Sequence, residues 1–119
     1  MKKIGIVGSR RCNSPDDYAV IKSAFFARYE YGDEIVSGGC CVGADSFAER
    51  IAKQYQIPIK IYYAAWDRLG KSAGFNRNGQ IAQGSEILIA AVAEDRTGGT
   101  EDTIKKFKKI HPHKEVALV

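Results

Sequence analysis

The chain has 119 residues, of which 45% are hydrophobic and 27% charged, and its formal net charge is +4. These values are close to those of ordinary globular proteins, which excludes a disordered or fibrous chain. No apolar run approaches the roughly 20 residues that a membrane-spanning helix needs. The first residues enter a strand without the apolar stretch of a signal peptide, so we expect a single cytoplasmic domain over residues 1–119.

Apolar runs typical of buried strands alternate with helical periods along the whole chain. Strands are expected at residues 4–7, 34–37, 59–63, 86–92 and 115–119, and helices at residues 15–31, 44–55, 72–84 and 99–110. Five strands separated by four helices predict an α/β fold with one doubly wound (Rossmann-like) parallel five-stranded sheet and helices on both faces.

Two segments carry local signals of their own. Ser14-Pro15-Asp16-Asp17 supplies an N-cap, a proline at the first helical position and acids in the first turn, and Gly32 is expected to stop this helix. The connection at residues 64–71 is longer than most loops of α/β proteins and carries the only tryptophan, Trp66. Long loops in compact domains are often functional, so we expect this one to contribute to a site.

Three glycine-bearing turns follow apolar runs, the first two directly and the third after five residues. They are Gly8-Ser9-Arg10, Ser37-Gly38-Gly39 and Gly98-Gly99-Thr100. In an open parallel sheet, the loops that leave the carboxyl ends of the strands line one crevice, where ligands bind. Glycine allows close approach of backbone N–H groups, and a helix N-terminus behind the loop favours anions. The turns therefore predict a pocket for a phosphorylated, nucleotide-like small molecule.

Several side chains near these turns have two interpretations. Arg10 is suited to bidentate contact with a phosphate, or it forms a surface ion pair. Asp45 can accept hydrogen bonds from ribose hydroxyls, or it only complements the dipole of the helix that it begins. Trp66 can stack on a base, or it covers the core beneath its loop. The sequence leaves these alternatives open.

Four motifs occur in order along most of the chain. They are Val7-Gly8-Ser9-Arg10, Ser37-Gly38-Gly39-x-x-x-Gly43-Ala44-Asp45, Trp66-x-x-x-Gly70-Lys71-x-Ala73-Gly74-x-x-Arg77-Asn78, and Gly99-Thr100. Together they resemble the SLOG superfamily of Rossmann-like domains, which includes YspA/YpsA-type proteins, the DNA-processing protein DprA and the Lonely Guy phosphoribohydrolases. Motifs and resemblance together indicate ligand-binding residues at Gly8, Ser9, Arg10, Ser37, Gly38, Gly39, Asp45, Trp66, Lys71, Arg77, Asn78, Gly98, Gly99 and Thr100.

The resemblance implies two small-molecule functions. The first is binding of a nucleotide or an NAD-, ADP-ribose- or cyclic-nucleotide-like molecule, by a sensor or sequestering protein. The second is hydrolysis of the N-glycosidic bond of a nucleoside 5′-monophosphate, for which Arg77 matches an arginine that faces the substrate. The hydrolase signature has a glutamate where this chain has Thr103, which leaves Arg77, Glu101 and Asp102 as catalytic candidates.

A third function is single-stranded DNA binding of the DprA kind. Its support is a group of lysines on and after the last helix, for which a solvated helix face is the favoured explanation: Lys105, Lys106, Lys108, Lys109 and Lys114. Aromatic residues interleaved with these cations, as in base-stacking platforms, are missing there. A nucleic-acid partner is therefore the less favoured expectation.

Neither a metal nor a cofactor is expected. The cysteines at 12, 40 and 41 and the histidines at 111 and 113 have no metal-ligand spacing. Cys40 and Cys41 are either redox-active or, more commonly for such residues, small fillers of a tight loop. A homo-oligomer is expected from an excess of aromatic residues around the first helix, taken as exposed: Phe25, Phe26, Tyr29 and Tyr31.

Overall fold

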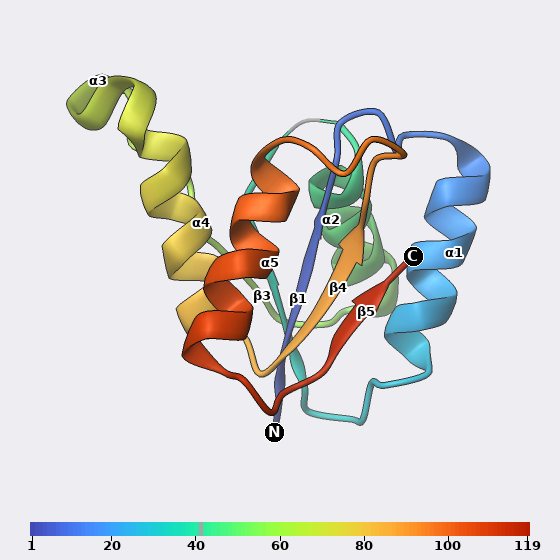
Figure 1. Cartoon of the computed structure of the whole chain (residues 1–119). Coiled ribbons are helices and arrows are strands. Elements are labelled where there is room, and N and C mark those ends of the chain that lie inside the picture. The colour runs from blue at the N-terminus through green and yellow to red at the C-terminus, as the bar shows by residue number, and fades with distance from the viewer. Residues whose placement is uncertain (41) are drawn as a thin grey trace.

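The computed structural model describes residues 1–40 and 42–119, without the side chains of residues 66, 67 and 71. One five-stranded sheet runs through the molecule in the order β3-β2-β1-β4-β5, and every pairing is parallel (Figure 1). Its strands are β1 (Lys3–Gly8), β2 (Glu34–Ser37), β3 (Ile59–Ile61), β4 (Ile87–Ala91) and β5 (Val116–Leu118). The predicted fold class is therefore confirmed.

Helices cover both faces of the sheet. They are α1 (Pro15–Phe26), α2 (Ala44–Tyr55), α3 (Trp66–Leu69), the 3₁₀ turn η1 (Gly70–Ser72), α4 (Ala73–Gly84) and α5 (Gly99–Ile110). Helices α1 and α2 pack on one face, and α4 and α5 pack together on the other (Figure 1). Each face of the sheet has its own hydrophobic core. Along β1, Ile4 and Ile6 belong to the core under α1 and α2 and Val7 to the core under α4 and α5, because successive side chains of a strand point to opposite faces.

Helix α1 begins where it was predicted to begin but ends earlier. The Ser14 hydroxyl accepts from the Asp17 backbone N–H at 3.1 Å, and the Asp17 carboxylate accepts from the Ser14 N–H at 3.1 Å, which is a capping box. The helix ends at Phe26, and a turn follows in which the Arg28 N–H donates to the Phe25 carbonyl at 3.0 Å. Farther on, the buried Asp33 carboxylate accepts from the backbone N–H groups of Lys2 and Glu30. The expected stop at Gly32 was too late.

The aromatic residues around α1 do not form the exposed group that the sequence suggested. Phe25 is fully buried, and Phe26 and Tyr29 are half-buried against the core that α1 shares with α2. Their rings pack on one another, with centroids 5.1–5.9 Å apart. Only Tyr31 is exposed. A wide core-facing surface therefore accounts for Phe25, Phe26 and Tyr29.

The connection at residues 64–71, expected as a long loop, is mostly helical. The Ala65 carbonyl accepts from the N–H groups of Arg68 and Leu69, which starts α3, and Gly70, at φ +57°, marks the break into η1. These turns run directly into α4 and project beyond the sheet (Figure 1). The strands also differ from prediction by one or two residues: β3 ends at Ile61, not at residue 63.

Within residues 1–40 and 42–119, no helix combines the length and the apolar character needed to cross a bilayer.

Candidate functional site

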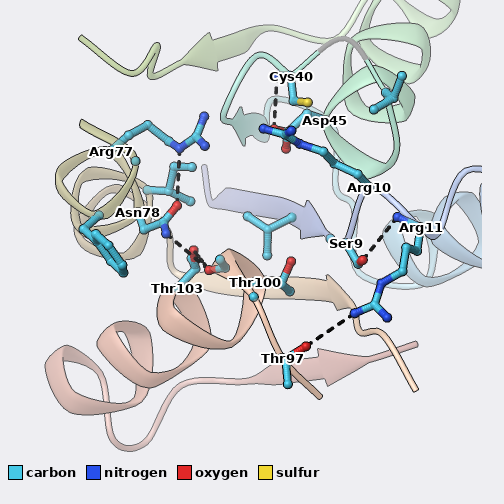
Figure 2. Close-up of a pocket in the computed structure, with 18 residues that line it drawn as sticks. Ser9, Arg10, Arg11, Cys40, Asp45, Arg77, Asn78, Thr97, Thr100 and Thr103 are labelled. Atoms are coloured by element: carbon cyan, nitrogen blue, oxygen red, sulfur yellow. Dashed lines mark hydrogen bonds between the residues drawn. The ribbon is translucent and has the colours of Figure 1, made fainter. Parts of the chain in front are cut away.

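A cavity of about 500 Å³ lies at the carboxyl ends of β1 and β4 (Figure 2). The strand order reverses between these two strands, because the chain moves from β1 out to β3 and returns to the other side of β1 at β4. In open α/β sheets this switch point is where ligands bind. The volume lies within the usual range of small-molecule pockets, roughly 300–1,000 Å³.

The cavity brings together most of the residues predicted to bind a ligand. They come from the β1–α1 turn, the start of α2, α4 and the start of α5: Gly8, Ser9, Arg10, Asp45, Arg77, Asn78, Gly98, Gly99 and Thr100. Four segments separated in sequence thus meet at one place, as the predicted sheet requires.

Other predicted residues lie beside the cavity or outside the described atoms. Ser37 is fully buried behind it. Gly38 and Gly39 line a smaller adjoining cavity. The side chains of Trp66 and Lys71, and all of Cys41, lie outside the described part of the structure.

The β1–α1 turn is held by close contacts with α2 and β4 and by hydrogen bonds of Ser9. A Cβ atom on Gly8 would come within 2.7 Å of the Ala44 Cβ and 2.8 Å of the Ala91 Cβ, so glycine lets α2 and β4 close over β1. The Ser9 N–H donates to the Ala91 carbonyl at 2.9 Å, and its hydroxyl accepts from the Arg11 N–H at 3.2 Å. Ser9 therefore shapes the turn as well as lining the cavity.

Two arginines leave this turn with different partners. Arg10 is exposed, and no hydrogen bond or ion pair joins it to another described residue. Arg11 forms a bidentate pair with Asp95, at 3.0 and 2.8 Å. It also donates to the Thr97 hydroxyl at 3.5 Å (Figure 2). Hydrogen bonds from Arg11 hold the pKa of the Asp95 carboxyl well below its usual range. Arg10 is thus available to a ligand, whereas Arg11 ties the β1–α1 turn to the β4–α5 loop.

Asp45 is turned back onto the loop that precedes α2. Its Oδ2 accepts from the Cys40 N–H at 3.1 Å and its Oδ1 from the Ser37 hydroxyl at 3.4 Å. Burial raises the pKa of this carboxyl, although the hydrogen bonds and the nearby Arg77 oppose the shift. Asp45 lines the cavity and also holds the loop before α2.

Arg77 and Asn78 link α4 to two other walls. The Arg77 Nη1 donates to the Gly38 carbonyl, and its Nε donates to the Asn78 Oδ1 at 3.3 Å. The buried Asn78 amide in turn donates to the Gly99 carbonyl at 3.2 Å (Figure 2). Asn78 therefore fixes Arg77 beside the start of α5 and is itself occupied by protein partners.

The first turn of α5 is open toward the cavity. Gly98 is the N-cap residue, at φ +102°, and no side chain caps the helix. The first N–H groups of a helix have no acceptors within it, so those of Gly99 and Thr100 can donate hydrogen bonds to a ligand. Thr103, at the position of the hydrolase glutamate, also lines the cavity and donates its hydroxyl to the Gly99 carbonyl at 3.1 Å.

The catalytic candidates Glu101 and Asp102 do not line the cavity. Glu101 forms a bidentate pair with Arg96, at 2.8 and 3.0 Å. Asp102 accepts from the Asn78 amide at 3.1 Å and from the Lys106 amino group at 2.9 Å. Of the carboxylates described, Asp45 is the one that lines the cavity, together with three arginines. Positive charge therefore dominates the wall.

Sequence reasoning missed half of the wall. The residues not predicted are Val7, Arg11, Cys40, Val42, Gly74, Phe75, Ile81, Thr97 and Thr103. Cys40, Thr97 and Arg11 adjoin predicted residues, so widening each motif would have found them. Gly74 and Phe75 lie at the start of α4, one turn before the predicted Arg77 and Asn78, and Gly74 belongs to the same motif.

Among the described side chains, no three histidine, cysteine or acidic residues gather as metal ligands would. The chain matches no protein-family model, and comparison with curated proteins and with solved structures finds no match either. The kind of ligand is therefore inferred from the residues that line the cavity.

Proposed function

We propose that this protein binds a phosphorylated, nucleotide-derived small molecule in the cavity at the carboxyl ends of β1 and β4. The observation that carries the proposal is one juxtaposition: the buried Asn78 amide bonds both the Arg77 guanidinium and the first residue of α5. A phosphate placed there meets an arginine and the open N–H groups of a helix start, two groups that favour anions.

The rest of the cavity suits the remainder of such a ligand. The buried Val7 and Ile81 and the exposed Phe75 contribute apolar lining. Pockets of this kind combine an apolar lining with a few fixed polar groups. The motifs shared with the SLOG superfamily support the same ligand class, in the role of a sensor or a sequestering protein.

Hydrolysis of a nucleotide has weaker support. Glycosidic cleavage needs a carboxylate within reach of the reacting atoms. Glu101 and Asp102 are engaged elsewhere, and Asp45 is held by its loop. Single-stranded DNA binding has only the exposed lysines of α5 in its favour, which include Lys105, Lys108 and Lys109.

A thermal-shift titration tests the proposal. AMP, ADP, ADP-ribose, NAD, a cyclic dinucleotide and a short oligonucleotide would each be added to the protein, and released base would be measured by chromatography. A ligand at 100 times its Kd adds about 2.7 kcal/mol to the free energy of unfolding, which is a large shift for a small domain. We expect a shift from nucleotides without base release.

The Arg10→Ala variant tests whether the ligand occupies this cavity. It should not alter folding, because Arg10 has no bond to another described residue that the substitution would remove. The shift should shrink in this variant while the unliganded Tm is unchanged. Released base would put the hydrolase first. A shift from the oligonucleotide alone would move the site to α5, and no shift from any nucleotide would refute the proposal.

A further inference from the structure

A second cavity, of about 200 Å³, adjoins the main one on the side of β2 and β3. Arg10, Cys40 and Arg77 line both cavities, so the two arginines stand where the cavities meet. Figure 2 shows both guanidinium groups on the same side of the main cavity, near Cys40 and Asp45. The second cavity is smaller than the pockets that hold whole small molecules, about 300 Å³ or more. Its size fits one end of a ligand that is anchored in the main cavity.

The far wall of the second cavity is an exposed aromatic ring. Tyr63 follows β3, and 67% of its surface is exposed. Its ring lies against the backbone of Gly39, where an added Cβ would come within 2.6 Å of a ring carbon. An exposed tyrosine supported by backbone on one side offers a platform for a planar group.

The arginines between the cavities suit a bridging phosphate. Arg10 has no partner among the described residues. Arg77 uses Nε and Nη1 for Asn78 and Gly38, which leaves its Nη2 group without a partner among the described residues. A phosphodiester or diphosphate keeps its negative charge when it is substituted at both ends, and arginine can bind its oxygens in pairs.

We propose that the ligand is a two-part nucleotide, in which a phosphate bridge lies at Arg10 and Arg77 and joins a nucleoside in the main cavity to a second planar group on Tyr63. This inference rests on the proposed function and narrows its ligand class. A mononucleotide fills the main cavity alone and leaves the Tyr63 subsite empty.

The test compares two probes that differ by one nucleoside, ADP and diadenosine 5′,5′-diphosphate. The Kd of each is measured by calorimetry for the wild-type protein, Tyr63→Ala and Tyr31→Ala. The second variant is a matched control, because Tyr31 is also exposed but lies before β2, at the opposite end of the sheet. The two-nucleoside probe carries less negative charge than ADP, so a gain in its affinity cannot come from electrostatic attraction to the arginines.

We expect the wild-type protein to bind diadenosine diphosphate at least tenfold more tightly than ADP, about 1.4 kcal/mol. Tyr63→Ala should remove this preference and leave the Kd of ADP within twofold, while Tyr63→Phe and Tyr31→Ala should retain it. Equal affinities for the two probes, or a preference that survives in Tyr63→Ala, would overturn the inference while ADP binding upheld the proposed function. Absence of binding by both probes would overturn the two together.

Discussion

The helices α2 and α5 begin in nearly the same way, yet they present different chemistry to the cavity. Each has a glycine N-cap at positive φ, Gly43 at +75° and Gly98 at +102°, and glycine has no side chain that could cap the helix. At α2, the acid Asp45 folds back onto the preceding loop. At α5, the acids Glu101 and Asp102 are held by basic residues away from the cavity. One glycine-rich turn is closed by its own acid, and the other is open to a ligand.

A glycine-rich turn before a helix is therefore not by itself an anion site. Whether an anion can bind there depends on the partners of the acidic residues in the first helical turn. Asp45 accepts from groups of the loop before α2, the Ser37 hydroxyl and the Cys40 N–H, so its negative charge stays beside this glycine-rich turn and disfavours an anion there. Arg96 and Lys106 draw the acids of α5 outward and leave its N–H groups available.

The largest effect that breaks this comparison is expected from Asp45→Ala. The variant leaves the Cys40 N–H and the Ser37 hydroxyl without an acceptor, and unsatisfied buried groups cost about 1–3 kcal/mol of unfolding free energy. Asp102→Ala should cost less, because Asn78 still donates to Gly99. Urea unfolding of both variants measures the difference. Equal losses would show that the two acids are equivalent.

Arg77→Ala is expected to weaken nucleotide binding at least tenfold, about 1.4 kcal/mol. The guanidinium is the fixed cation beside the open end of α5, whereas Lys109→Ala removes an exposed cation remote from the cavity and should leave the Kd unchanged. Calorimetric titration with ADP measures both. A large loss of stability with an unchanged Kd would assign Arg77 to structure instead.

We expect Asp45 to contribute to the pH dependence of the free energy of unfolding. Burial raises the pKa of its carboxyl in the folded protein, so the folded state takes up a proton more readily than the unfolded state does. The contribution of Asp45 to stability therefore increases as pH falls through the raised pKa toward the ordinary value, about 3.9. Relative to Asp45→Asn, the wild-type protein should gain stability over this window. A relative loss as pH falls would mean that the pKa is lowered.

The same experiment has an internal contrast in Asp33. For this carboxyl, burial is outweighed by hydrogen bonds from the Lys2 and Glu30 backbone and from the Lys2 amino group, and the pKa is lowered. Its contribution is present above the ordinary pKa and is lost as pH falls through the lowered one. Asp33→Asn should therefore shift the pH profile in the opposite direction to Asp45→Asn.

The smallest effect is expected from Glu101→Gln. Glu101 lies outside the cavity wall and pairs with Arg96 at an exposed position. The variant should change the Kd of ADP by less than twofold. A much larger change in affinity would show that the carboxylate reaches the ligand, and a loss of base-releasing activity would restore it as a catalytic candidate.

The sequence predicted the fold because each level of its pattern agreed with the next. The bounds of α2 and α5 lie where the glycine turns and helical periods predict them, and Ser14 caps α1 as expected. The carboxyl edge of the sheet follows from parallel strands, so the meeting of Arg10, Arg77 and Gly99 at one cavity could also be predicted.

The remainder depends on contacts between distant parts of the chain. The Asp33 carboxylate holds the segment after α1 by accepting from the backbone N–H of Lys2, 31 residues away. Arg11 is drawn to Asp95, 84 residues away, and no local pattern indicates that pair. The outward turn of Glu101 depends on Arg96, which stands in a left-handed conformation at φ +54°. Propensities and motifs describe neighbours in sequence and do not fix which carboxylates remain free.

The most direct measurement is a titration of isotope-labelled protein with ADP, followed through the backbone amide resonances. We expect the backbone amide resonances of Gly99 and Thr100 to shift most, together with the side-chain Nε resonance of Arg77, because the proposed phosphate site is the start of α5. Shifts confined to the lysines of α5, or centred on Cys40 and Asp45 at the start of α2 with Gly99 and Thr100 unmoved, would contradict it.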